Sequence, residues 1–328
     1  MTTRYALLLA PLLALALVEP ASPSDGPVQA AEDATPRLSA AASLGLTAPR
    51  AAELQQAIDA HNYPTAEKIL LAEIDRDPHS ASAGRMLALA GTVYFLSHDY
   101  LNAAIAWKKS DAIAPLDPSL RFSLAMTYIR IAHPDWARPE LQSLAQHFPA
   151  NPLFPYWLGR VDYDTHLYDA AIRHFQHAIE LDPSMARAYD NLGLCYYYEN
   201  QNALAVENYN KAIELERRSQ HPSPWPYLNL AVTQQFLGQL SNAEANLHEA
   251  LRLDPSLVSA HFQLGTVFED LGQLDHAVVE LREAARLDPA YPEPHSILAR
   301  IYHRLGQQQA AHDEVEIYER LRPHSAKP

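Results

Sequence analysis

The stretch Leu264–Pro289 reads LGTVFEDLGQLDHAVVELREAARLDP, and the stretch Leu230–Pro255 reads LAVTQQFLGQLSNAEANLHEALRLDP. They start 34 residues apart, and LGQL and RLDP recur in register. Prolines extend this period, since seven of them close apolar segments at successive intervals of 37, 34, 34, 72, 34 and 34 residues. These prolines are Pro78, Pro115, Pro149, Pro183, Pro255, Pro289 and Pro323. The interval of 72 spans two repeats, with Arg217 where one proline would fall. A fixed period of this length indicates a repeat architecture.

Each repeat has the apolar spacing of two short helices. Leu264, Val267, Phe268 and Leu271 follow the i, i+3, i+4, i+7 pattern of one helical face. A Gly-Gln break follows, and a second series of helical spacing runs from 274 to 284. The sequence therefore predicts a helical hairpin in every repeat.

Small residues recur where the two helices of a hairpin must approach closely, because a large side chain there would overpack the pair. In the first helix they are Gly91, Ala125, Gly159, Gly193, Ala231, Gly265 and Ala299. In the second helix they are Ala103, Ala137, Ala171, Ala205, Ala243, Ala277 and Ala311.

Together, the small residue after Leu, the aromatic residue three positions later, the later Ala and the closing Pro resemble the tetratricopeptide repeat family. The resemblance covers about 270 residues. It implies an all-α, right-handed superhelical solenoid of about eight hairpin repeats, with the first helices lining a concave face. The repeats begin near residues 48, 84, 118, 152, 186, 224, 258 and 292.

The N-terminal segment differs from the repeats. Arg4 precedes an uncharged apolar run of 13 residues, Ala6–Val18, which is shorter than the roughly 20 residues of a membrane span. We interpret residues 1–30 as a signal peptide, residues 31–47 as a disordered leader rich in Ala, Pro and Ser, and residues 48–325 as the solenoid. The alternative for the first segment is an uncleaved membrane anchor. We therefore expect an exported protein, periplasmic or secreted.

Composition and motifs exclude several functions. The formal net charge of -14 disfavours a nucleic-acid partner. None of the nucleotide-binding, serine hydrolase or zinc protease motifs occurs, and Cys195 is interpreted as a buried apolar residue. His174 and His177, with Glu180 a turn later, are spaced as metal ligands on a helix, but we favour a solvated surface. The sequence thus predicts no enzyme, no cofactor and no metal.

The predicted function is a non-enzymatic protein–protein interaction scaffold in the bacterial cell envelope, which binds a peptide or partner helix on its concave face. The alternative is an accessory subunit of an envelope glycan-processing or secretion complex that contacts its substrate through an aromatic concave surface. Both predictions follow from the family resemblance and the export signal, and neither identifies the partner.

The predicted binding residues lie on the first helices of repeats four to six. They are Tyr156, Arg160, Tyr163, Arg187, Asn191, Tyr198, Trp225, Asn229 and Phe236. An Asn side chain offers both a donor and an acceptor to a peptide backbone, and aromatic side chains commonly anchor interfaces. Arg130, Arg160 and Arg187 would form a basic line suited to a ligand carboxylate.

The last repeat is expected to expose apolar side chains. The final helix carries apolar side chains three positions apart, at Val315, Tyr318 and Leu321. No further capping helix is recognised after it. We therefore expect an apolar strip that contacts a partner or a second copy of the chain.

Overall fold

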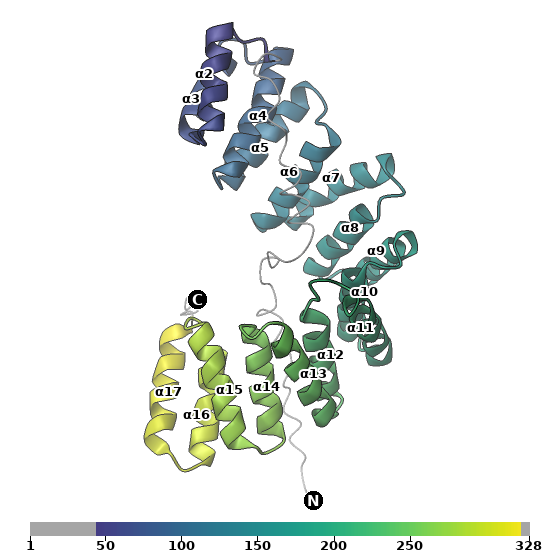
Figure 1. The fold of residues 1–328 in the computed structure, drawn as a ribbon, viewed down its shortest axis with the longest axis vertical. Coiled ribbons are helices and arrows are strands. Elements are labelled where there is room, and N and C mark those ends of the chain that lie inside the picture. The colour runs from purple at the N-terminus through teal and green to yellow at the C-terminus, as the bar shows by residue number, and fades with distance from the viewer. Residues whose placement is uncertain (1–43, 323–328) are drawn as a thin grey trace, which may run out of the picture. The chain divides into compact units, whose positions relative to one another are not determined.

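The computed structural model describes residues 44–322, in which sixteen α-helices and no strand are found (Figure 1). The predicted signal peptide, residues 31–43 of the predicted leader, Pro323 and the last residues of the chain lie outside this range. Leu44 is described and is buried against the core of the first hairpin. No helix among the described residues combines the length and the apolarity that a bilayer span requires.

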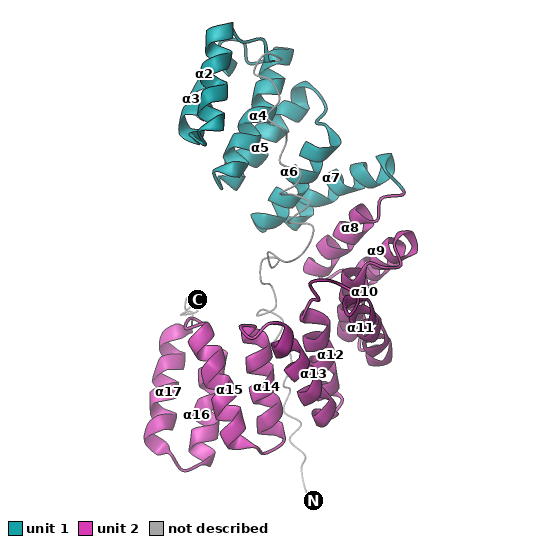
Figure 2. Cartoon of the chain, in the orientation of Figure 1, with its two compact units in different colours: residues 1–149 teal, residues 150–328 magenta. Residues whose placement is uncertain are grey.

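The chain divides into two compact units, residues 1–149 and 150–328 (Figure 2). The first unit contains three hairpins, α2/α3, α4/α5 and α6/α7. Their bounds are α2 Ala48–Asp59, α3 Tyr63–Ile74, α4 Ala81–Leu96, α5 Tyr100–Ile113, α6 Pro118–Arg130 and α7 Pro134–His147.

The second unit contains five hairpins, α8/α9 to α16/α17. Their bounds are α8 Leu153–Asp164, α9 Tyr168–Leu181, α10 Ala186–Tyr198, α11 Asn202–Glu216, α12 Trp225–Phe236, α13 Leu240–Leu253, α14 Val258–Asp270, α15 Leu274–Leu287, α16 Glu293–Arg304 and α17 Gln308–Leu321. Within this unit each second helix packs on the first helix of the next hairpin. Single hairpins therefore share one continuous core, the arrangement that stabilises solenoids.

The predicted close approach within hairpins is confirmed at the glycines. A Cβ atom added to Gly193 would lie 2.6 Å from Cε1 of Tyr209, and one added to Gly265 would lie 2.6 Å from Cγ of Leu281. Gly91 meets Trp107 in the same way. In each pair the large, buried side chain belongs to the second helix and stands 16 residues after the glycine.

The two helices of each hairpin are joined through a residue of left-handed backbone conformation, the usual way to end a helix. Glycine supplies it in the last three repeats, at Gly238, Gly272 and Gly306, where φ lies between 72° and 75°. In three earlier repeats the residue is a histidine whose Nδ1 lies 2.8–3.1 Å from the Oη of the tyrosine two positions later. These pairs are His61–Tyr63, His98–Tyr100 and His166–Tyr168.

Candidate functional site

All nine predicted binding residues lie on three first helices of the second unit, α8, α10 and α12. Three of them are buried: Tyr156, Asn191 and Asn229 are 3%, 6% and 6% exposed. The Asn191 amide donates to the backbone oxygen of Arg187 at 2.7 Å, and the Asn229 amide donates to Asp190 Oδ1 at 3.0 Å. Both amide groups therefore form hydrogen bonds within the protein, and the two buried asparagines expose little surface to a ligand.

The predicted basic residues are engaged in part with aromatic rings. The guanidinium of Arg187 lies 4.7 Å from the ring centroid of Tyr156, and that of Arg130 lies 4.8 Å from the ring of Tyr100 in the first unit. A cation above a ring face is attracted by the quadrupole of the ring. Trp225 is half-buried and packs against the core of the second unit.

The other predicted aromatic residues meet one another at the carboxyl ends of the first helices. The rings of Tyr163 and Tyr198 are 5.8 Å apart at an angle of 63°, and Tyr168 stacks on Tyr198 at 5.0 Å and 5°. Burial raises the pKa of the Tyr163 and Tyr168 hydroxyls, so both stay protonated at neutral pH. Sequence reasoning named Tyr163 and Tyr198 for this cluster and missed Tyr168, which follows the turn.

Phe236 continues the aromatic surface into the sixth repeat. Its ring lies 6.1 Å from that of Tyr197 in an edge-to-face arrangement, and 63% of the side chain is exposed. Exposed leucines mark the turn regions of the same three hairpins, at Leu167, Leu204 and Leu237. Large apolar side chains are thus left open to solvent at one end of repeats four to six.

These aromatic contacts belong to a regular series, which we call the ladder. Each rung joins the twelfth residue of one repeat to the thirteenth residue of the next, counted from the repeat starts at 152, 186, 224, 258 and 292. The four rungs are Tyr163–Tyr198, Tyr197–Phe236, Gln235–Asp270 and Glu269–Arg304. The ladder has a regular spacing in the sequence. Three of the four pairs are 35 residues apart, and the other is 39 residues apart because the fifth repeat is longer.

The two histidines that suggested metal binding have different surroundings in the structure. His174 Nδ1 lies 2.7 Å from Oδ2 of Asp162, whose side chain is fully buried, while His177 is exposed. Among residues 44–322, no group of three or more His, Cys, Asp or Glu side chains is placed to hold a metal ion. Cys195 is buried as predicted, and burial raises the pKa of its thiol to about 12.

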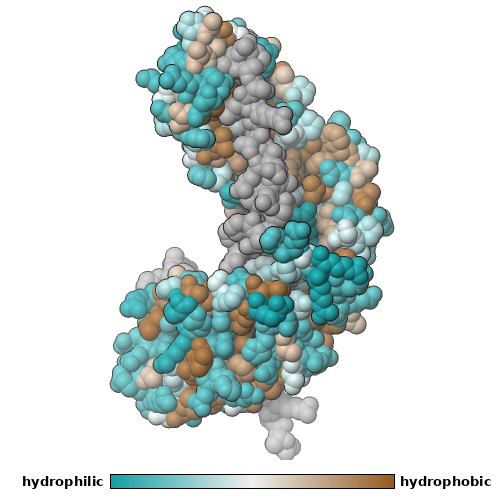
Figure 3. All heavy atoms as spheres, viewed as in Figure 1, coloured by the Kyte–Doolittle hydropathy of each residue, from teal (hydrophilic) through white to brown (hydrophobic). Residues whose placement is uncertain are grey.

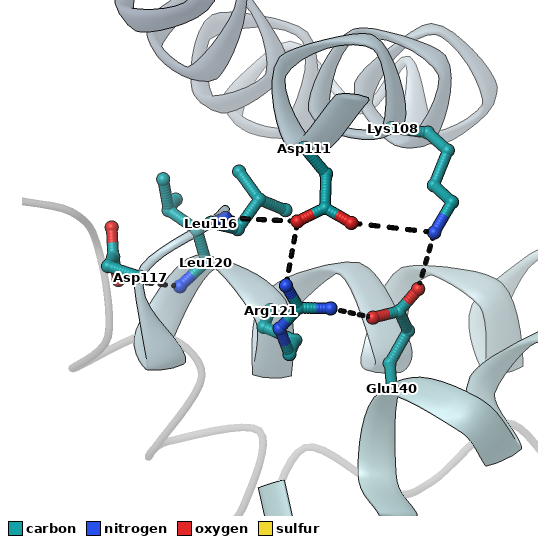
Figure 4. Close-up of polar contacts among 7 residues, drawn as sticks. All are labelled: Lys108, Asp111, Leu116, Asp117, Leu120, Arg121 and Glu140. Atoms are coloured by element: carbon teal, nitrogen blue, oxygen red, sulfur yellow. Dashed lines mark hydrogen bonds and ion pairs between the residues drawn. The ribbon is translucent and has the colours of Figure 1, made fainter. Parts of the chain in front are cut away.

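An ion-pair network ties three helices of the first unit together (Figure 4). Arg121 on α6 contacts Glu140 on α7, and its Nη2 lies 2.7 Å from Asp111 Oδ1 on α5. Lys108 on α5 reaches Glu140 at 2.9 Å, and Glu140 is only 5% exposed. Two cations and two carboxylates thus neutralise one another. This network holds hairpins together and leaves no surplus charge for a ligand.

The sequence matches three repeat-family models, all in the second unit. Residues 158–222 and 226–257 match models described as tetratricopeptide repeat, and residues 267–306 match one described as TPR repeat. The chain is 30% identical to a Hsp70-Hsp90 organising protein of Plasmodium falciparum over 112 residues, 34% of this chain and 42% of that protein. It is 22% identical to the human tetratricopeptide repeat protein 6 over 147 residues, 43% of this chain and 27% of that protein. Each match thus spans less than half of the relative's length.

Solved structures share the fold at low sequence identity. A tetratricopeptide repeat protein from Parabacteroides merdae superposes with a TM-score of 0.60 at 13% identity, covering 83% of this chain and 98% of that one. PilW, a type IV pilus biogenesis factor, gives a TM-score of 0.58 at 22% identity, covering 64% of this chain and 95% of PilW. Likenesses at this identity establish the all-α repeat fold.

Proposed function

The chain is a tetratricopeptide repeat protein, and we propose that it is a non-enzymatic interaction scaffold for a peptide or helix of a partner protein. The binding surface is formed by the carboxyl ends of the first helices in repeats four to six. One relative is named for organising two other proteins, Hsp70 and Hsp90, and this name supports a scaffold role. The proposal places the scaffold in the bacterial cell envelope, because the N-terminal segment has the pattern of an export signal.

The open aromatic surface carries this proposal. On the face shown in Figure 3, apolar patches lie among the polar side chains that cover both units. Phe236 is the most exposed large apolar side chain described, at 63%, and it lies against Tyr197 rather than alone. Aromatic rings held in place by neighbours lose little entropy on binding, and such residues often dominate interface energies.

A crosslinking pull-down from envelope extract tests this surface. Phe236→Ala and Tyr198→Ala are expected to reduce recovery of the partner at least tenfold, as the loss of an aromatic anchor commonly costs about 2 kcal/mol. Val279→Ala is the matched control, because Val279 is equally exposed, at 62%, but lies on a second helix. Thermal melts of Phe236→Ala and Val279→Ala should match the unmodified protein, whereas Tyr198→Ala also loses its ring contacts with Tyr163 and Tyr168 and should melt slightly lower.

Two results would redirect the proposal. Full partner recovery with both aromatic variants places the interface elsewhere on the chain. Binding to a glycan array that depends on Tyr198, with no protein recovered, supports the alternative of a subunit that contacts glycan. Asn229→Ala distinguishes a structural role of Asn229 from a role in binding. It breaks the hydrogen bond to Asp190 and is expected to lower the melting temperature.

A further inference from the structure

The ladder changes its chemistry along the second unit. Its first two rungs are aromatic, the third joins an amide to a carboxylate, and the fourth is an ion pair. We propose that the ladder binds an extended partner segment in a fixed order, with apolar residues over the first two rungs and an acidic residue over the fourth. This inference rests on the proposed function and specifies the ligand that the same surface accepts.

The fourth rung presents two guanidinium groups and little of their carboxylate. Glu269 is 9% exposed at its side chain, and Arg300 and Arg304 are 61% and 48% exposed above it. Arg300 binds Glu269 through Nε at 2.8 Å and Nη2 at 2.6 Å, and Arg304 contacts it through Nη1 at 3.3 Å. The two arginines are balanced in charge by Glu269 and by nearby Asp270, which also interacts electrostatically with Arg300. What a ligand meets is the pair of exposed guanidinium groups, and guanidinium groups suit a carboxylate.

The third rung separates the apolar and acidic positions. Gln235 Nε2 donates to Asp270 Oδ2 at 2.6 Å, and Asp270 is exposed. A carboxylate of the ligand next to Asp270 would be repelled, whereas a backbone N–H or an amide would be accepted. An acidic residue is thus disfavoured over the third rung and favoured one step further.

The repeat spacing sets the distance between the two kinds of ligand residue. Neighbouring packed helices lie roughly 8–10 Å apart, so the second and fourth rungs are separated by about 20 Å. An extended chain advances about 3.3 Å per residue, and about six residues cover this distance. A helical ligand would need about 13 residues at 1.5 Å each.

Selection from a phage library of random 12-residue peptides on the full chain tests the order. The selected peptides should carry an aromatic or aliphatic residue about six positions from an Asp or Glu, with acidic residues depleted between them. Selection on the double variant Arg300→Gln/Arg304→Gln should keep the apolar residue and lose the acidic one. By fluorescence anisotropy, the best wild-type peptide should bind this variant at least tenfold more weakly, about 1.4 kcal/mol, because its carboxylate loses charge-assisted hydrogen bonds.

The control is the double variant Arg252→Gln/Arg286→Gln. These arginines are 64% and 66% exposed and pair with glutamates on second helices, so the peptide should bind within about twofold of wild type. Arg304→Gln alone keeps the two bonds of Arg300 to Glu269. A loss of peptide binding in this single variant therefore does not follow from misfolding around an unpaired Glu269. Selected peptides that carry the apolar residue but no acidic residue would overturn the inferred order of the ligand and leave the proposed function standing. Enrichment of no peptide would overturn both.

Discussion

At the scale of single residues, the hairpins are held by pairs whose sizes compensate. Where the small residue of the first helix is Gly, the residue 16 positions later is Trp107, Phe175, Tyr209 or Leu281. Where it is Ala, at 125, 231 and 299, that residue is Leu141, Leu247 or Val315. Three of the four glycines thus face a side chain larger than any that faces an alanine. Such compensation is expected of interiors packed to crystal density.

The Gly193–Tyr209 pair allows a direct test of this compensation. Gly193→Ala should destabilise the protein by about 1–3 kcal/mol, because its Cβ would lie 2.6 Å from the Tyr209 ring. Adding Tyr209→Leu should recover part of this loss, since two of the three repeats with Ala at this place have Leu opposite. Urea unfolding of the two single variants and the double variant gives the coupling energy.

Glu207→Gln serves as the control for that cycle. Glu207 is exposed on the same helix as Tyr209, and its loss should change stability by less than about 0.5 kcal/mol. Additive effects of Gly193→Ala and Tyr209→Leu would contradict the size compensation.

At the scale of elements, a polar pair recurs between the helices of the last two hairpins. His261 Nδ1 lies 2.7 Å from Glu280 Oε2, and His295 Nδ1 lies 2.6 Å from Glu314 Oε2, one repeat further on. Arg121 and Glu140 occupy the equivalent places in the third repeat. The same pair of helix positions therefore carries a basic side chain and a carboxylate in three hairpins.

The His261 pair makes stability depend on pH. Burial lowers the pKa of His261, but hydrogen bonds to Glu280 and to the Pro255 carbonyl oxygen outweigh it, so the folded pKa lies above the usual 6.5. The protonated pair thus contributes its full stability below pH 6.5, and this contribution is lost as pH rises through the folded pKa. The melting temperature should fall from pH 6 to pH 8, and fall less in His261→Gln. The matched control is His177→Gln, which removes an exposed imidazole and leaves the His261–Glu280 pair in place.

Most of the fold could be predicted from sequence, but only part of the candidate site. Period and apolar spacing predict helices because every repeat buries the same positions, and Gly193 and Gly265 lie where predicted. Asn191 and Asn229 were predicted to face a ligand, yet a buried Asp190 and a backbone carbonyl take their amide donors. Which polar groups become buried depends on how neighbouring repeats pack, and periodicity within one repeat does not contain that information.

At the scale of the whole molecule, the last helix that the structure describes, α17, has a largely polar outer face. Gln308, His312 and Glu319 on α17 stand where α15 has Leu274, Val278 and Ala285. Val315 remains 40% exposed in the place of the buried Leu281, and Tyr318 and Leu321 are half-buried. This polar face narrows the predicted apolar strip to a small area around Val315.

Export is a further prediction for the whole chain. If residues 1–30 are a signal peptide, the mature protein isolated from the cell envelope should lack them, because signal peptidases cleave after small residues such as Ala30. Intact-mass spectrometry measures this directly. A mass that still includes Met1–Val18 would instead indicate a retained membrane anchor.

The register of the ladder also has a consequence for how the gene can gain or lose repeats. Excision of residues 186–223 would bring the twelfth residue of repeat four, Tyr163, next to Phe236, and an aromatic rung would survive in a shorter array. Excision of residues 258–291 would instead set Gln235 beside Arg304 and remove the only carboxylate that binds this guanidinium in the ladder. Homologues of different length should therefore vary at the fifth repeat and retain the seventh.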